Sequence, residues 1–159
     1  IGRLQTNKVK YIIGKVVLIH SVDSEKLAEK ISDLSIKAGI RTDILVEINI
    51  AGEESKAGIK PGDAESFIRS LEKYEGIRVC GLMTSAPICD DPEDNREYFR
   101  EMRSLFFKLQ NIFDIDKEKD HNIFMRYLSM GMTGDYLTAL DEGSNIVRVG
   151  TGIFGERVY

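Results

Sequence analysis

Long apolar runs, an excess of one charge and a cysteine framework are all missing from this sequence. Among its 159 residues, no run approaches the ~18 consecutive apolar residues of a membrane-spanning helix. The 22 basic and 26 acidic side chains give a formal net charge of −4 and are interspersed, so no basic patch indicates binding to nucleic acid or to an anionic membrane. We therefore expect a water-soluble protein with neither of these partners.

Cysteine and histidine are few and scattered. Cys80 and Cys89 form neither a CxxC pair nor part of a dense framework, which is typical of a reducing compartment. His20 and His121 lack the spacing of metal ligands. The sequence contains no GxSxG, HExxH or GxxxxGK[ST] motif, which disfavours nucleophilic hydrolases and P-loop nucleotide hydrolysis. These features predict a cytoplasmic protein without a bound metal.

What is present is one domain's worth of chain with a regular strand and helix pattern. Apolar, β-branched segments predict five strands, at residues 16–22, 43–50, 77–83, 124–130 and 145–150. Between and before them, apolar stripes predict helices at 4–13, 27–38, 61–74, 98–113 and 135–142. The charged stretches 90–95 and 114–121 are expected to be solvated loops. Strands separated this widely can be parallel and joined by helical crossovers.

The spacing of the strands leaves two architectures open. Strand starts at 16, 43, 77, 124 and 145 give spacings of 27, 34, 47 and 21 residues, against roughly 31 per unit in an eight-unit barrel of ~250 residues. Five units do not close a barrel, so that architecture requires about three further units outside this chain. A doubly wound sheet requires none. Periodicity alone favours neither.

Glycine turns follow the last two predicted strands. Residues 150–155 contain a literal GxGxxG, but only four residues follow Gly155, too few for the helix, strand and acidic residue of a dinucleotide fold. A strand that turns through glycine into a helical turn still presents free N–H groups that bind phosphate. The segments 129–135 and 150–155 are therefore candidate phosphate loops, the alternative being two ordinary glycine turns.

Three side chains near the ends of predicted strands are further candidates for a ligand site. Arg148 can reach a ligand in a barrel mouth, or it can form a salt bridge to a carboxylate such as Glu47. Asn49 lies at a similar position near the end of its strand. Met83 either fills the core or forms a ligand wall. The residues alone do not decide between these alternatives.

Five motifs in order resemble the pyridoxal phosphate homeostasis protein family. The matching segments are 1–8 (IGRLQTNK), 47–58 (EINIAGEESKAG), 81–84 (GLMT), 128–136 (LSMGMTGDY) and 148–157 (RVGTGIFGER). The resemblance implies an α/β fold, a TIM (β/α)8 barrel of the alanine racemase N-terminal-domain type that binds pyridoxal 5′-phosphate (PLP). It favours the barrel over the doubly wound sheet.

The resemblance also implies that the sequence is a fragment. It opens at Ile1 inside a patterned segment, whereas the family carries roughly two earlier strands, including the lysine that forms the Schiff base with PLP. None of Lys8, Lys10 and Lys56 takes that role, because each belongs to another motif. We therefore expect residues 1–159 to form a single PLP-binding barrel domain that lacks its first strands and helices.

The site residues follow from the resemblance, motif by motif. The Ser129 hydroxyl, with the backbone of Met130 and Gly131, resembles a phosphate ligand, and Gly150 and Thr151 resemble donors on the other side. Arg148 resembles the arginine that faces the pyridine nitrogen. Because a guanidinium only donates, the nitrogen opposite it stays unprotonated and the ring is a weaker electron sink. Asn49 and Met83 resemble residues lining the ring. Thr133 stands where serine is common.

The function implied is PLP homeostasis within the cell. The protein would hold PLP and hand it on, with PLP-dependent apoenzymes as partners, without substrate turnover and as a monomer when complete. Two alternatives remain at this point: a PLP-dependent amino-acid racemase or decarboxylase of the same fold, and a phosphosugar-binding barrel.

Overall fold

Five parallel strands form one sheet in the computed structural model, which describes residues 1–114 and 122–155. The strands are Ile19–Val22 (β1), Thr42–Glu47 (β2), Ile77–Met83 (β3), Ile123–Met132 (β4) and Ile146–Arg148 (β5). Their order in the sheet is β1-β2-β3-β4-β5, the same as in the chain. A doubly wound sheet reverses its order at a switch point, so that alternative is wrong for these strands.

Helices fill the connections. The α-helices are Glu25–Lys37 (α1), Ala64–Ser70 (α2), Arg96–Asp114 (α3), Tyr136–Asp141 (α4) and Thr151–Phe154 (α5). The 3₁₀ helices are Thr6–Tyr11 (η1), Pro61–Asp63 (η2), Leu71–Lys73 (η3) and Pro92–Asn95 (η4). The α1, α2, α3 and α4 helices confirm four of the predicted helices, whereas 4–13 contains a 3₁₀ helix that buries only Val9.

Several predicted boundaries are wrong for identifiable reasons. The strand expected from residue 16 begins at Ile19, because Val16 and Val17 are exposed and find no partner strand among the described residues. β4 runs to Met132 and so includes residues expected in a loop. Residues 90–95 are not simply a solvated loop, because η4 buries Asn95. Of the loop expected at 114–121, Asp114 ends α3 and the rest lies outside the described residues.

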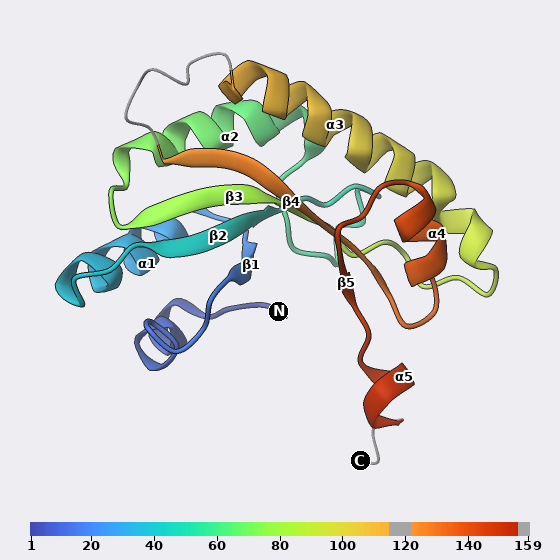
Figure 1. The fold of residues 1–159 in the computed structure, drawn as a ribbon, viewed down its shortest axis with the longest axis horizontal. Helices are drawn as coiled ribbons and strands as arrows, with labels where there is room; N and C mark the ends of the chain where they lie inside the picture. Colours follow the sequence, from blue (N-terminus) through green and yellow to red (C-terminus); the bar gives the residue numbers. More distant parts are fainter. Residues whose placement is uncertain (115–121, 156–159) are drawn as a thin grey trace.

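The main core lies between the sheet and helices α1, α2 and α3, which run along one face of it (Figure 1). The stripe predicted on α3 is confirmed, since its core-facing side chains Phe99, Met102, Phe106, Leu109 and Phe113 are all buried. Apolar positions at three- to four-residue spacing place these side chains on one face of the helix. The opposite face of the sheet carries a second, smaller cluster of Leu45, Cys80 and Met83.

The sheet is strongly curved around this second face. His20 Nδ1 of β1 lies 3.1 Å from Ser129 Oγ of β4, although β2 and β3 lie between these strands in the sheet. Two side chains can meet across two intervening strands only if the sheet bends toward them. The five strands therefore form a parallel half-barrel, and the face that carries His20 and Ser129 is its concave face.

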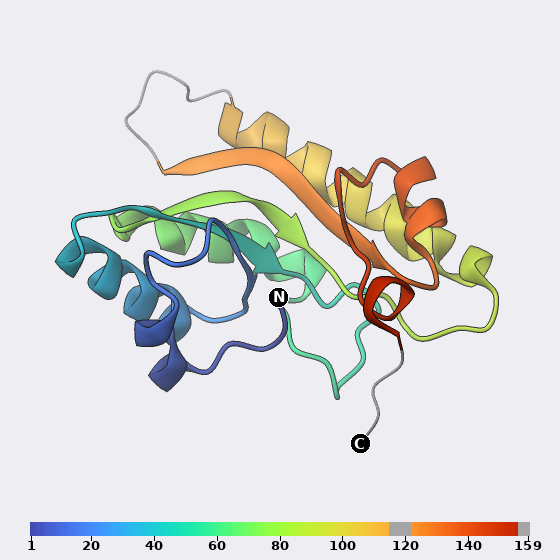
Figure 2. The same ribbon diagram turned by 60° about the horizontal axis from the view of Figure 1, so that its bottom comes forward.

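The connections that follow the strands gather at one end of the half-barrel. Figure 2 shows the loop after β3, the turn after β4 and helix α5 close together at the end to which the strands point. In parallel barrels this carboxyl end carries the ligand sites. A ligand site is therefore expected at this end of the half-barrel.

Candidate functional site

A cavity of about 520 Å³ lies at the carboxyl ends of β3, β4 and β5. Three segments line it, together with Asn95: residues 86–89 after β3, residues 132–135 at the end of β4 and in the turn that follows it, and the turn and helix that follow β5. Parts of both predicted phosphate loops thus face one cavity, residues 132–135 of the first and Gly150, Thr151, Phe154 and Gly155 of the second. Loops at this end of a parallel barrel are where phosphate groups are bound.

Thr133 joins the two loops. Its Oγ1 accepts hydrogen bonds from the backbone N–H groups of Gly150 and Gly152, each at 3.2 Å. A hydroxyl oxygen has two acceptor sites and one donor proton. With both acceptor sites used, the Thr133 hydroxyl has its proton left to donate, and Thr133 lines the cavity. We call Thr133, Gly150 and Gly152 the amide–hydroxyl cradle.

Gly131 allows the turn that presents Thr133. Its φ is +92°, a conformation that side chains rarely adopt. A Cβ at this position would lie 2.6 Å from the Cβ of Ala139 in α4. The absence of a side chain therefore lets the end of β4 pass close to α4 before the chain turns into the cradle.

A second polar group lies on the concave face behind the cavity. Arg148 Nη1 donates to Ser129 Oγ at 2.9 Å, and Nη2 donates to the Thr84 carbonyl at 2.7 Å and to Ser85 Oγ at 3.2 Å. Since the Ser129 oxygen already accepts from Arg148, its own proton is free for Nδ1 of His20. Burial, with the positive charges of the chain's amino group and Arg148, lowers the pKa of His20 to about 4, so the ring is neutral and able to accept.

Arg148 is a buried cation. Its side chain is only 9% exposed, and burial lowers its pKa, while the charges of Asp135 and Glu47 act in the opposite direction. Among the described residues it makes no ion pair, with Glu47 or any other carboxylate. A buried charge without a counter-charge is costly. Such a group is typical of a ligand site, where the ligand supplies the compensating interaction.

The predicted phosphate residues lie at different depths. Gly150 and Thr151 line the cavity, as does Thr133. Ser129 and Met130 are completely buried, Ser129 against Arg148 and Met130 in the main core. The hydrogen bonds of Thr133 to Gly150 and Gly152 were not predicted. The hint in the sequence was that position 133 of the segment 128–136 keeps a hydroxyl, threonine in place of the common serine.

The predicted ring-lining residues lie away from the cavity. Met83 belongs to the small cluster on the concave face. Asn49 Nδ2 donates to the carbonyls of Glu53 and Lys56, at 2.8 and 3.3 Å, and so holds the loop after β2. Its Oδ1 is buried and has no hydrogen-bond partner among the described residues. The structure therefore places Met83 on the concave face and Asn49 against the loop after β2, and neither residue in the cradle.

The described part of the chain contains neither a candidate metal site nor a membrane-spanning helix. Within residues 1–114 and 122–155, no three His, Cys, Asp or Glu side chains gather as a metal site would require. Every helix in those ranges is too short or too polar to cross a membrane. Both cysteines are free thiols.

Comparison with known proteins identifies relatives along the whole chain. The model of the family "Alanine racemase, N-terminal domain" matches residues 2–158. A pyridoxal phosphate homeostasis protein from Aquifex aeolicus is 45% identical over 159 residues, which cover all of this chain and 66% of the relative. The protein of the same name from Synechocystis is 30% identical over 99% of this chain and 69% of the relative. The chain thus spans about two thirds of the length of these relatives.

Solved structures agree with the sequence relatives. PipY of Synechococcus elongatus, in a structure without PLP, superposes with a TM-score of 0.85 at 29% identity, over 98% of this chain and 69% of PipY. PipY with PLP bound superposes with a TM-score of 0.82 at 28% identity, over 98% of this chain and 68% of PipY.

Proposed function

The chain belongs to the pyridoxal phosphate homeostasis protein family, with the fold of the alanine racemase N-terminal domain, and from this we propose that it binds PLP in the cavity at the carboxyl ends of β3, β4 and β5. The PLP-bound structure of the relative PipY supports this ligand. The proposed role is to hold the cofactor and release it, without substrate turnover.

The amide–hydroxyl cradle is the observation that carries the proposal. The PLP phosphate is an anion that accepts hydrogen bonds and donates none at neutral pH. Thr133 has a proton to donate, and the N–H groups of Gly150 and Gly152 converge on its oxygen. These two N–H groups hold the Thr133 hydroxyl in place, so its proton needs little reorganisation to donate to an anion. The Thr133 hydroxyl therefore fits a phosphate oxygen, and we assign it as the side-chain donor to the PLP phosphate, with Thr151 beside it in the cavity.

Arg148 is the group proposed for the ring nitrogen. When bound, PLP supplies an aldehyde for amines and a pyridine ring that withdraws electrons. A guanidinium donates and does not accept, so it favours an unprotonated ring nitrogen. Ser129 and Thr84 fix the guanidinium from behind. We therefore propose that Ser129 orients Arg148 rather than touching the phosphate. In this proposal the PLP ring extends from the cavity toward the concave face that carries Arg148 and Met83, with Asn49 at the edge of that region.

The half-barrel belongs, in this proposal, to one closed PLP-binding barrel. β1 and β5 each pair with a single strand in the described sheet, and this chain covers only 66% of the Aquifex aeolicus relative, which leaves about one third of that relative's length unmatched. Further strands that pair with β1 and β5 would complete a (β/α)8 barrel. The complete protein would be a cytoplasmic monomer that passes PLP to PLP-dependent apoenzymes, and the two free thiols are compatible with a reducing compartment.

Calorimetric titration of the protein with PLP, and separately with pyridoxal, tests the function. We expect saturable binding of PLP and much weaker binding of pyridoxal, because pyridoxal has no phosphate for the cradle. Incubation of the PLP-loaded protein with L-alanine is expected to leave the enantiomer unchanged. Equal affinity for both ligands, or racemisation of alanine, would contradict the proposal.

A further inference from the structure

Asn95 connects two of the segments that line the cavity. It lies where η4 meets α3 and is only 1% exposed. Its Nδ2 donates to the carbonyl of Pro87 and to Oδ2 of Asp135, each at 2.9 Å. Pro87 belongs to the segment after β3 and Asp135 to the turn after β4. A single buried amide group thus fixes the distance between them.

Asp135 passes this constraint to the cradle. Its Oδ1 accepts from the backbone N–H of Met132 at 2.7 Å, and its Oδ2 accepts from Asn95. Both carboxylate oxygens are therefore engaged, one inside the turn 132–135 and one outside it. Thr133 lies within that turn, so the position of its hydroxyl depends on Asp135.

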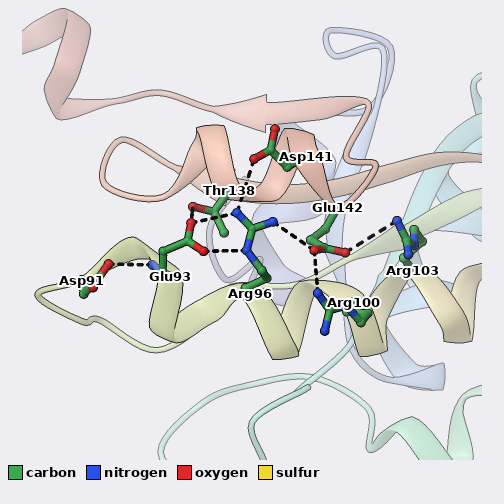
Figure 3. Close-up of polar contacts among 8 residues, drawn as sticks. All are labelled: Asp91, Glu93, Arg96, Arg100, Arg103, Thr138, Asp141 and Glu142. Atoms are coloured by element: carbon green, nitrogen blue, oxygen red, sulfur yellow. Dashed lines mark hydrogen bonds and ion pairs between the residues drawn. The ribbon is translucent and has the colours of Figure 1, made fainter.

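Ion pairs at the surface also join the start of α3 to α4. Figure 3 shows Arg96, the next residue after Asn95, between acidic side chains of η4 and of the α4 end. Arg96 pairs with Glu93 at 2.6 Å, with Asp141 at 3.3 Å and with Glu142 at 3.0 Å. Asn95 therefore holds the beginning of α4 from within, and Arg96 holds its end from the surface.

We propose that Asn95 is a positioning residue for phosphate recognition: its two amide protons hold the 132–135 turn against the loop after β3, so that Thr133 meets the phosphate. The inference rests on the proposed PLP function. Both protons of Nδ2 are used, one for each acceptor. An ionised aspartate at this position has the same shape but donates nothing, and it would repel Asp135.

The test compares Asn95→Asp with Arg96→Gln as its matched neighbour. The measured quantity is the ratio of the affinities for PLP and pyridoxal. We expect Asn95→Asp to lower this ratio about tenfold or more, the scale of one hydrogen bond to a charged group. Arg96→Gln is expected to lower the melting temperature and leave the ratio unchanged, because it loosens only the outer contacts.

Reversing the hydrogen bond provides a rescue. In the double variant Asn95→Asp with Asp135→Asn, the new amide at 135 can donate to the carboxylate at 95 while its oxygen still accepts from Met132. We expect the ratio to recover partly. If Asn95→Asp does not fold, Asn95→Ser, which retains one donor, replaces it and is expected to lower the ratio less.

The outcomes separate this inference from the proposed function. An unchanged ratio in the folded Asn95 variant, or an equal loss in Arg96→Gln, would overturn the positioning role, and partial recovery in the double variant would support it. No preference for PLP over pyridoxal in the parent protein would instead overturn the proposed function itself.

Discussion

Replacing Thr133 with valine removes the hydroxyl of the cradle while nearly preserving the shape of the side chain. The hydroxyl accepts from Gly150 and Gly152 and has one proton left to donate. Both N–H groups are exposed, so water can replace their lost partner and the cost to folding is small. The principal loss is therefore one donor to the phosphate.

A hydrogen bond to a charged group contributes ~1.5–3 kcal/mol. Since each ~1.4 kcal/mol is a factor of ten in affinity, Thr133→Val is expected to weaken PLP binding roughly 10- to 150-fold. The affinity for pyridoxal should stay within about twofold of the parent, because pyridoxal has no phosphate. Calorimetric titration with both ligands measures the two affinities.

Two further variants make this experiment decisive. Thr133→Ser keeps the hydroxyl and is expected to bind PLP like the parent. Thr138→Val removes a buried threonine hydroxyl of α4 that donates to Glu93 at 3.2 Å and does not line the cavity, and it too should leave binding unchanged. PLP affinity in Thr133→Val equal to that of the parent would refute the reasoning about the cradle.

Three other predictions address the parts of the site around the cradle. Arg148→Gln should weaken the binding of PLP and of pyridoxal by similar factors, because both ligands have the ring nitrogen. A loss of affinity for PLP alone would contradict the placement of Arg148 at that nitrogen. Gly131→Ala should lower the free energy of unfolding by ~1–3 kcal/mol in urea denaturation, whereas Gly134→Ala, at a position with open space, should change it by less than ~0.5 kcal/mol. Because the pKa of His20 is lowered to about 4, the unfolded chain binds a proton more readily than the folded chain between about pH 6.5 and 4. The free energy of unfolding should therefore fall as the pH falls through this window, and His20→Asn should reduce this dependence on pH. An unchanged dependence in His20→Asn would refute the reasoning.

The repeating part of the fold could be predicted because it follows simple patterns. The stripe on α3 and the five β-branched segments record which side chains are buried, and burial at period 3.6 or 2 is directly visible in sequence. The strand at 77–83 was predicted with its observed bounds. Strand order could not be read in this way, because it depends on contacts between segments far apart in the chain. It is the sequential order that excluded a doubly wound sheet.

The site was predictable at the level of loops but not of individual contacts. Glycine and hydroxyl residues after the last two strands indicated where a phosphate could bind, and the two loops do line one cavity. Whether Ser129 or Thr133 faces that cavity depends on where β4 ends, and β4 extends to Met132. The burial of Asn95 could not be predicted, because its sequence neighbours are acidic and polar and nothing in them indicates that one amide among them is buried.

The most direct test of the account is to locate the phosphate on the protein by NMR. Backbone ¹H–¹⁵N resonances are followed while PLP, and separately pyridoxal, is added to saturation. The account predicts large shifts of the Gly150 and Gly152 amides with PLP and small shifts of the same amides with pyridoxal. Amides of Gly150 and Gly152 that do not move when PLP saturates the protein would contradict the claim that this cradle holds the phosphate.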